Sequence, residues 1–394
     1  MMKLLLACSA ICMMGSCHAQ TDPPAVAVLQ KTAAALNSFT KMSYHYTREM
    51  RYYENNYHNI DSAALYVEYI KNSPIGLRFQ ANQERSAFIY DGGITLRLDK
   101  KGMTIDSASV KTAREMESSS FLYHSLPMLR NILPLIINND SIQKTVSDTT
   151  ISAQSFLCVK LEGPGMYFTL TDIKRAQSPV AQKVYYLIID KKTYLPFQFI
   201  AKFIRGRDDR DFVTIAYTNI NTRPVVPPAA SWTYVAYAHQ YQPFRPDVKV
   251  PMVKTGDIAN NFRLPDYTPG FIDSVSLYQF AGKIVLLDFW FKSCGPCMEA
   301  MPHYNALQNK FDTAHFQLLS INIEDGEKDM QFFFNKFRPT YKMLYKGGEV
   351  FKRMGLPGCP SLVLLDKKGK VVQVAVGFDQ QAIEKKIEEV MAQN

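Results

Sequence analysis

The sequence lacks the patterns that mark several classes of protein. Its formal charge is +9 and its pI is about 9.0, but it contains no run of five or six basic residues, so a nucleic-acid partner is not expected. Beyond the first residues, no window of 18 residues is both apolar and uncharged, so no further membrane span is expected. The seven histidines show no metal-ligand spacing, and Gly92-Gly93 and Gly347-Gly348 lack the context of a phosphate-binding loop. We therefore expect no bound metal.

The overall composition is that of an ordinary globular protein. Apolar residues make up 47% of the chain and charged residues 21%, which argues against wholesale disorder and against a fibrous repeat. A chain of 394 residues is long enough for two or three domains.

Residues 1–19 have the pattern of a cleaved export signal. Met1-Met2-Lys3 is a short basic start, an apolar stretch continues to Met14, and small residues precede Gln20 at the expected cleavage point. The apolar stretch is too short to span a bilayer as a mature helix. The pattern predicts export to the periplasm or cell envelope. Acylation at Cys17, which would anchor the protein to lipid, is the alternative.

Cysteine is scarce in the rest of the chain. Cys8, Cys12 and Cys17 lie in the predicted signal, so only four of the seven cysteines would remain after export. Cys158 lies alone in an apolar run, where a cysteine usually behaves as a small buried hydrophobic residue. The other three lie in the last third of the chain, at positions 294, 297 and 359.

A proline-rich connector separates two bodies of sequence. Residues 223–251 carry too many prolines for a regular element, so we place a first domain at 20–222 and a second at 252–394. Aromatic residues such as Trp232 and Tyr241 suggest that the connector packs on a domain surface, although an extended spacer fits the sequence equally well.

The first domain is predicted to be α+β, with an antiparallel sheet covered on one face by helices. Helical patterns occur at 26–36 and 121–138, with Pro127 and Pro134 limiting the second, and Asp91-Gly92-Gly93 and Asp190-Lys191-Lys192-Thr193 predict turns. The predicted strands are 42–51, 75–80, 86–90, 94–98, 155–161, 183–189, 198–203 and 213–217.

This order, with phrases such as Phe88-Ile89-Tyr90-Asp91-Gly92-Gly93, resembles the LolA-like half-barrel of bacterial lipoprotein carriers over residues 25–220. Such folds curl a sheet around an apolar cavity, so the resemblance implies a module that binds an apolar ligand or docks a protein. A scaffold that only positions the second domain remains the alternative.

One chemical motif stands out in the second domain. Residues 283–291 form a nearly continuous apolar run with one acid, which predicts a strand buried on both faces. Cys294-Gly295-Pro296-Cys297 follows and opens a helical stretch, so the first cysteine lies at the positive end of a helix, where a thiolate is stabilised. Cys294 is the candidate nucleophile, and Cys297 is close enough to resolve its mixed disulfide.

Three other interpretations of the cysteine pair compete with the redox one. Zinc would need further ligands, and only Cys359 and His303 are spare. A c-type haem would need histidine after Cys297, where Met298 stands. A purely structural disulfide would not predict the strand before the pair or the helix after it.

Residues 250–394 resemble the thioredoxin superfamily and, within it, the extracytoplasmic TlpA/ResA-like thiol-disulfide oxidoreductases, with an α/β fold. The resemblance implies that Asp288 is the buried acid that exchanges a proton with the second cysteine, with a pKa raised by desolvation. It implies that Pro360 is the cis-proline against which substrate backbone docks. It also implies that Trp290 and the Gly295-Pro296 pair contact the substrate or modulate the cysteines.

Two residues depart from the family pattern. Ser293 replaces a tryptophan that commonly precedes the first cysteine, so partner specificity does not carry over. Cys359 precedes Pro360, where threonine or valine is usual, and is either a modulator of the pair or a small residue that fills its site. The remaining predicted elements are strands at 315–323, 361–366 and 371–376 and helices at 327–337 and 380–391.

The sequence thus predicts an exported oxidoreductase that reduces protein disulfides. Its only redox group would be the Cys294–Cys297 disulfide, its substrates protein thiols and disulfides, and its electron donor a membrane thiol transporter implied by the resemblance. A lipid- or lipoprotein-binding protein with an accessory redox domain, and a disulfide oxidase or isomerase, are the alternatives.

Overall fold

The structure is a computed structural model that describes residues 23–117, 119, 121–176, 182–205, 208–245, 250–267 and 274–393. Two units make up the chain: the first comprises the residues up to Met50 and Asn59–Phe244, and the second comprises Arg51–His58 and the residues from Arg245 onward. The predicted export signal, with Cys17, lies outside the described residues. None of the helices in the described ranges is long and apolar enough to cross a membrane.

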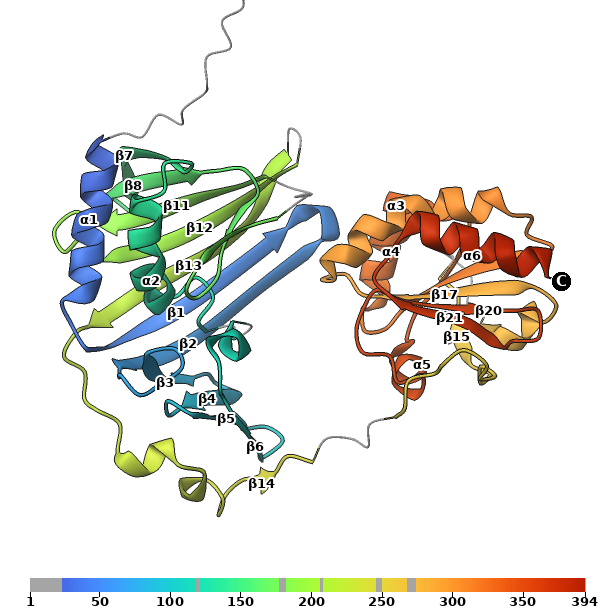
Figure 1. Cartoon of the computed structure of the whole chain (residues 1–394), viewed down its shortest axis with the longest axis horizontal. Helices are drawn as coiled ribbons and strands as arrows, with labels where there is room; N and C mark the ends of the chain where they lie inside the picture. The colour runs from blue at the N-terminus through green and yellow to red at the C-terminus, as the bar shows by residue number, and fades with distance from the viewer. Residues whose placement is uncertain are drawn as a thin grey trace, which may run out of the picture. The chain divides into compact units, whose positions relative to one another are not determined.

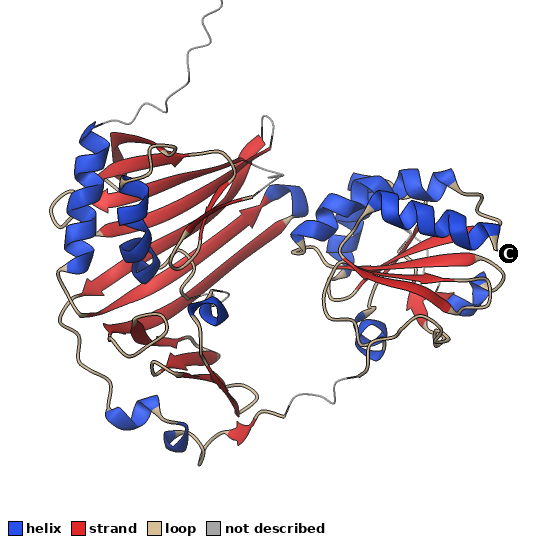
Figure 2. Cartoon of the chain, in the orientation of Figure 1, coloured by secondary structure: helices blue, strands red, loops and turns tan. Residues whose placement is uncertain are grey.

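The first unit is built on a large sheet (Figures 1 and 2). Within the described residues the sheet has 12 strands in the order β14-β6-β5-β4-β3-β2-β1-β13-β12-β11-β8-β7. Neighbours from β2 to β6 and from β7 to β13 pair antiparallel, whereas β14 adds to β6 in parallel. The strands are β1 (Lys41–Tyr52), β2 (Tyr57–Tyr69), β3 (Leu77–Asn82), β4 (Ser86–Tyr90), β5 (Ile94–Asp99), β6 (Thr104–Ser109), β7 (Gln143–Ile151), β8 (Gln154–Glu162), β11 (Gln182–Asp190), β12 (Pro196–Arg205), β13 (Asp208–Asn221) and β14 (Gln242–Pro243), with a separate hairpin of β9 (Met166–Phe168) and β10 (Ile173–Arg175).

The two predicted turns form as aspartate-centred loops. Asp91 accepts the backbone N–H groups of Gly93 and Ile94 through Oδ1, and Gly92 takes a φ of 116° that L side chains rarely adopt. Asp190 accepts the backbone N–H groups of Lys192 and Thr193 between β11 and β12, and these bonds lower the pKa of its carboxyl. The turns fix the registers of their hairpins.

Helices α1 (Pro23–Asn37) and α2 (Leu126–Ile137) lie side by side on one face of this sheet (Figure 1). The second helix begins five residues later than the sequence predicts, because Ser125 caps it by accepting the backbone N–H of Met128 at 3.2 Å. Pro127 lies in the first turn, where its missing N–H costs nothing, and Pro134 lies inside the helix without ending it.

The connector packs on the first unit. Trp232 and Tyr241 are buried in one cluster with apolar side chains of β2, β4, β5 and β6, and the guanidinium of Arg78 lies 4.5 Å from the centre of the Trp232 ring. Residues 229–244 therefore pack on a domain surface, which is the first of the two alternatives that the sequence leaves open.

Cys158, on β8, is half-buried, so the expectation of a buried position is wrong. Its side chain lies on the partly exposed face of the strand.

The second unit holds a mixed five-stranded sheet in the order β19-β18-β17-β20-β21. Strand β17 pairs parallel with β18 and antiparallel with β20, so it lies at the centre. The strands are β17 (Ile284–Trp290), β18 (Phe316–Asn322), β19 (Lys342–Leu344), β20 (Ser361–Leu365) and β21 (Val371–Val376), beside the short pair β15 (Arg263–Pro265) and β16 (Ser274–Ser276).

Helices cover this sheet on both faces (Figure 2). Even-numbered side chains of β17, such as Leu286, pack against α3 (Gly295–Lys310), α4 (Glu327–Phe337) and α6 (Gln380–Ala392). Odd-numbered ones, such as Leu287, pack against α5 (Gly348–Arg353) and the 3₁₀ turn at Leu277–Phe280. Every residue of β17 is buried, as its continuous apolar run predicts.

Candidate active site

The two cysteines of the motif form a disulfide where β17 gives way to α3. Cys294 and Cys297 have Cα atoms 5.3 Å apart. Cys294 is the N-cap of α3, and its sulfur accepts the backbone N–H of Cys297 at 3.2 Å. Because the N-terminal end of a helix carries partial positive charge, this position favours a thiolate on Cys294 once the disulfide is reduced.

The two cysteines are both buried. Cys294 is 5% exposed and Cys297 1% exposed, and both belong to the core between β17 and α3. Gly295 and Pro296 are exposed at the start of the helix. A partner therefore meets the Gly-Pro turn first, and the sequence prediction that Gly295 and Pro296 contact substrate remains a prediction.

Asp288 is a buried acid on the same side of β17. It is 1% exposed, and it accepts hydrogen bonds from the Tyr304 hydroxyl through Oδ1 and the Ser320 hydroxyl through Oδ2, each at 2.9 Å. Ser320 is its direct neighbour on the parallel strand β18, and Tyr304 is on α3. Burial raises the pKa of Asp288 to about 7, against the lowering effect of the two hydrogen bonds. The raised pKa is as the sequence predicts.

Trp290 lies inside the core. It is fully buried, and its ring meets that of Phe333 edge to face with centroids 5.1 Å apart. Its indole N–H has no hydrogen-bond partner among the described residues. Burial argues against direct substrate contact, because the ring would have to leave the core; of the two roles predicted for Trp290, modulation is the one compatible with this position.

Pro360 follows a cis peptide bond, as the resemblance implies. Its carbonyl accepts the backbone N–H of Gly377 at 2.8 Å, so the strand that follows starts with its backbone already paired.

Cys359 is half-buried and packs against the core cluster that contains Cys294 and Cys297. Burial, together with the nearby carboxylates of Asp288 and Glu324, raises the pKa of the Cys359 thiol to about 12.

Hydrogen bonds and an ion pair hold the loop before the cysteines, and the sequence reasoning did not predict them. Asp325 accepts the backbone N–H of Lys292 at 2.6 Å, and the Lys292 ammonium pairs with Asp329 at 2.9 Å. Asn322 donates to Asp325 at 2.7 Å. Because β17 and β18 are parallel, Lys292 and Asp325 follow strand ends at the same sheet edge, and this rule was the signal that could have predicted these contacts.

In the described ranges, no group of three or more His, Cys, Asp or Glu side chains could hold a metal ion.

The comparison with known families agrees with this geometry. Residues 254–391 match the Redoxin family. The prediction of a thioredoxin-type domain in the C-terminal part of the chain is thereby confirmed; we call residues 254–391 the Redoxin domain. The LolA-like half-barrel stays a prediction: the N-terminal unit is a large sheet with two helices on one face.

The Redoxin domain has similar relatives. The thiol-disulfide oxidoreductase ResA of Halalkalibacterium halodurans is 27% identical over 139 residues, which are 35% of this chain and 77% of that protein. The ResA of Bacillus thuringiensis subsp. konkukian is 29% identical over 126 residues, which are 32% of this chain and 71% of that protein.

Solved structures match the same part of the chain. One, described as a thiol:disulfide interchange protein DsbE from Chlorobium tepidum, is 30% identical, covers 36% of this chain and 96% of that one, and gives a TM-score of 0.32. The thioredoxin domain of a thiol-disulfide oxidoreductase from Bacteroides vulgatus is 26% identical, with 34% and 99% covered and a TM-score of 0.31.

Proposed function

We propose that the Redoxin domain is a protein thiol-disulfide oxidoreductase that works through Cys294 and Cys297. The observation that carries the proposal is the disulfide at the N-terminus of α3, with Asp288 buried behind it. A structural disulfide needs neither a helix N-terminus for its first sulfur nor an acid whose pKa is raised to about 7. The relatives named thiol-disulfide oxidoreductase support the same conclusion.

The proposed cycle begins with the reduced pair. The Cys294 thiolate attacks one sulfur of a substrate disulfide, forms a mixed disulfide and releases the other substrate sulfur as a thiolate, which takes up a proton. Cys297 then loses its proton and attacks Cys294, so that the Cys294–Cys297 disulfide forms and the second substrate thiol leaves. The substrate gains two electrons and two protons; the protein loses two electrons and the Cys297 proton, and the other proton comes from water.

Asp288 is proposed to handle the proton of Cys297. Its carboxylate is hydrogen-bonded to Tyr304 of α3, the same helix that carries Cys297. A group with a pKa near 7 can both accept and return a proton at neutral pH, which is what alternating oxidation and reduction of a buried thiol requires. Pro360 is proposed to align the substrate backbone beside the pair.

The direction of electron flow is proposed to be reductive. Gly295 and Pro296 between the cysteines resemble the pair found in strongly reducing thioredoxins. An exported reductant must be reduced again from outside, so the proposal includes a membrane thiol donor and a position in the periplasm or cell envelope, with an anchor at Cys17 as the alternative to cleavage. An oxidase or isomerase would share the site and differ in potential.

Insulin reduction by the full chain tests the activity. Cys294→Ser is expected to abolish it, and Cys158→Ser, which removes a cysteine of the other unit, is the matched control and is expected to retain it. Full activity of Cys294→Ser would refute the proposal.

Titration in dithiothreitol and glutathione buffers tests the direction. A potential below about −200 mV supports a reductant, whereas one near about −120 mV indicates an oxidant.

A further inference from the structure

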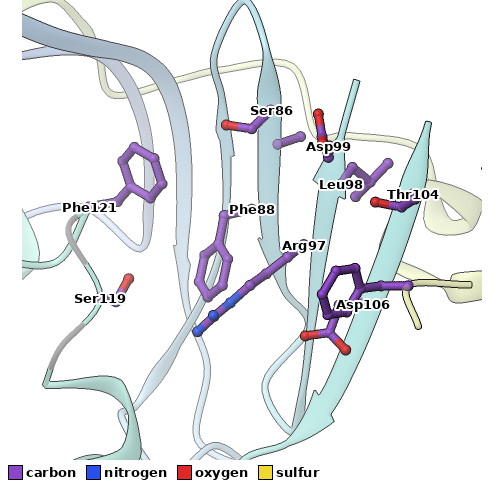
Figure 3. A pocket seen from close by; sticks show the side chains of 11 residues that line it. Ser86, Phe88, Arg97, Leu98, Asp99, Thr104, Asp106, Ser119 and Phe121 are labelled. Carbon is purple, nitrogen blue, oxygen red and sulfur yellow. The ribbon is translucent and has the colours of Figure 1, made fainter. Parts of the chain in front are cut away.

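The N-terminal unit carries a pocket at the end of its sheet that the redox chemistry does not use. It has a volume of about 540 Å³ and lies over β4, β5 and β6 (Figure 3). Pockets of about 300–1,000 Å³ are typical of sites that bind small molecules. Its lining consists of Ser86, Ala87, Phe88, Arg97, Leu98, Asp99, Thr104, Asp106, Ser119, Phe121 and Phe244.

The pocket lies on the face of β4, β5 and β6 that carries Phe88, Arg97 and Asp106. The connector covers the opposite face, where Trp232 and Tyr241 form one buried cluster with Leu96 and Ile105. On the pocket face, the rings of Phe88 and Phe121 lie with centroids 6.3 Å apart and form an apolar wall. Each is 8% exposed, so the wall is held by packing and does not depend on a ligand.

Two oppositely charged side chains, those of Arg97 and Asp106, are exposed beside this apolar wall. Arg97 and Asp106 are direct neighbours on β5 and β6, yet Arg97 is directed to Phe88, with its guanidinium 5.3 Å from the ring centre (Figure 3). Among the described residues, neither side chain has an ion pair or a hydrogen bond with another group. Asp99, by contrast, already accepts the backbone N–H groups of Lys101 and Gly102. The pocket thus offers one free donor group and one free acceptor group.

An extended segment of the chain, β14, already pairs with the edge of this sheet. Strand β14 adds to β6 through the backbone bonds from Gln242 N to Met103 O at 2.9 Å and from Phe244 N to Ile105 O at 2.7 Å. This brings the Phe244 side chain to the pocket, where it stays 51% exposed. Addition of a strand with an aromatic side chain at a neighbouring pocket is a general mode of peptide recognition.

We propose that this pocket binds an extended stretch of an unfolded polypeptide, with an aromatic or large aliphatic side chain against Phe88 and Phe121 and its backbone amides on Arg97 and Asp106. A peptide group offers a carbonyl to the guanidinium and an N–H to the carboxylate, so both charges gain a partner. An acyl chain would take Arg97, Asp99 and Asp106 out of water without replacing their hydrogen bonds, which disfavours lipid as the occupant. That the polypeptide is also the disulfide-exchange substrate rests on the proposed function; the binding does not.

The test measures binding without redox chemistry. The full chain with Cys294→Ser and Cys297→Ser is titrated into fluorescently labelled, reduced and carboxymethylated α-lactalbumin, which is unfolded and has no thiols, and anisotropy gives the affinity. Arg97→Ala and Asp106→Ala replace exposed side chains that have no ion pair or hydrogen bond among the described residues, and each is expected to weaken binding at least about fivefold. Arg223→Ala and Asp148→Ala, exposed residues of the same unit outside the pocket, are the matched controls.

Two results would overturn the proposal. One is an affinity that the pocket variants change no more than their controls do. The other is binding of phosphatidylglycerol vesicles, lost in the pocket variants, in a protein that does not bind the polypeptide. Because insulin reduction is measured separately, failure of this binding leaves the proposed redox function untouched, and loss of insulin reduction leaves this test interpretable.

Discussion

Replacement of Asp288 by asparagine should remove one specific pH dependence from the stability of the oxidised protein. The native carboxyl holds its proton up to about pH 7, because burial raises its pKa from the ordinary 3.8 to about 7. In the unfolded chain the same carboxyl is ionised above about pH 4. Between these values the folded state binds the extra proton, so the stability conferred by this group falls as the pH rises.

The size of the effect follows from the pKa. Each pH unit between the two pKa values changes the free energy of unfolding by about 1.4 kcal/mol. From pH 5 to pH 8 the native carboxyl passes from protonated to ionised, so wild type should lose about 3 kcal/mol relative to Asp288→Asn. The asparagine also offers one acceptor where Tyr304 and Ser320 both donate, which adds a cost of about 1–3 kcal/mol at every pH.

Urea denaturation of both oxidised proteins between pH 5 and pH 8 measures this difference. Contributions from Glu324 and Asp325, whose pKa values burial also raises, are shared by the two proteins and cancel. Asp312→Asn, an exposed position of the same domain, is the control and should leave the pH dependence unchanged. If the wild-type and Asp288→Asn stabilities run parallel over this range, the assignment of a raised pKa to Asp288 is wrong.

The other predictions concern the cysteines and the first unit. Cys297→Ser should accumulate a mixed disulfide between Cys294 and a substrate, detectable on a non-reducing gel, and a protein that turns over without such an intermediate would contradict the resolving role. Cys359→Val should leave the exchange rate within about twofold, because a thiol with a pKa of about 12 is almost entirely protonated at pH 7; a larger change would make Cys359 part of the mechanism. Iodoacetamide should label Cys294 of the reduced protein well before Cys359 at pH 7, as peptide mapping would show. Lys144→Met should lower the free energy of unfolding by about 1–3 kcal/mol, because the buried ammonium donates to the carbonyls of Asn139 and Ile142 at 2.8 and 2.9 Å; an effect as small as that of the partly exposed Lys191→Met would contradict this.

Elements with strong local patterns were predictable from the sequence. The predicted bounds of α4, β4 and β21 are those of the structure, because each combines a clear hydrophobic period with defined ends. Strands β2, β6 and β7 were missed because their side chains break the alternation. The inward residue near the start of β7 is Lys144, and in β6 only Ile105 is buried, so hydropathy carries no strand signal there.

The sequence by itself predicted the thioredoxin-type domain and its candidate redox pair, since a buried strand, a Cys-Gly-Pro-Cys turn and a helix are consecutive in the chain. Only the tertiary structure decided which groups surround that pair. Ser320 reaches Asp288 across two parallel strands, and Asp325 reaches the loop before Cys294 from the end of the second strand. The pocket beside Phe88 likewise joins three strands, the loop at Phe121 and the end of the connector. These contacts join residues that are far apart in the sequence. The distances between such residues are set by the tertiary fold, so the local sequence pattern around each residue does not predict them.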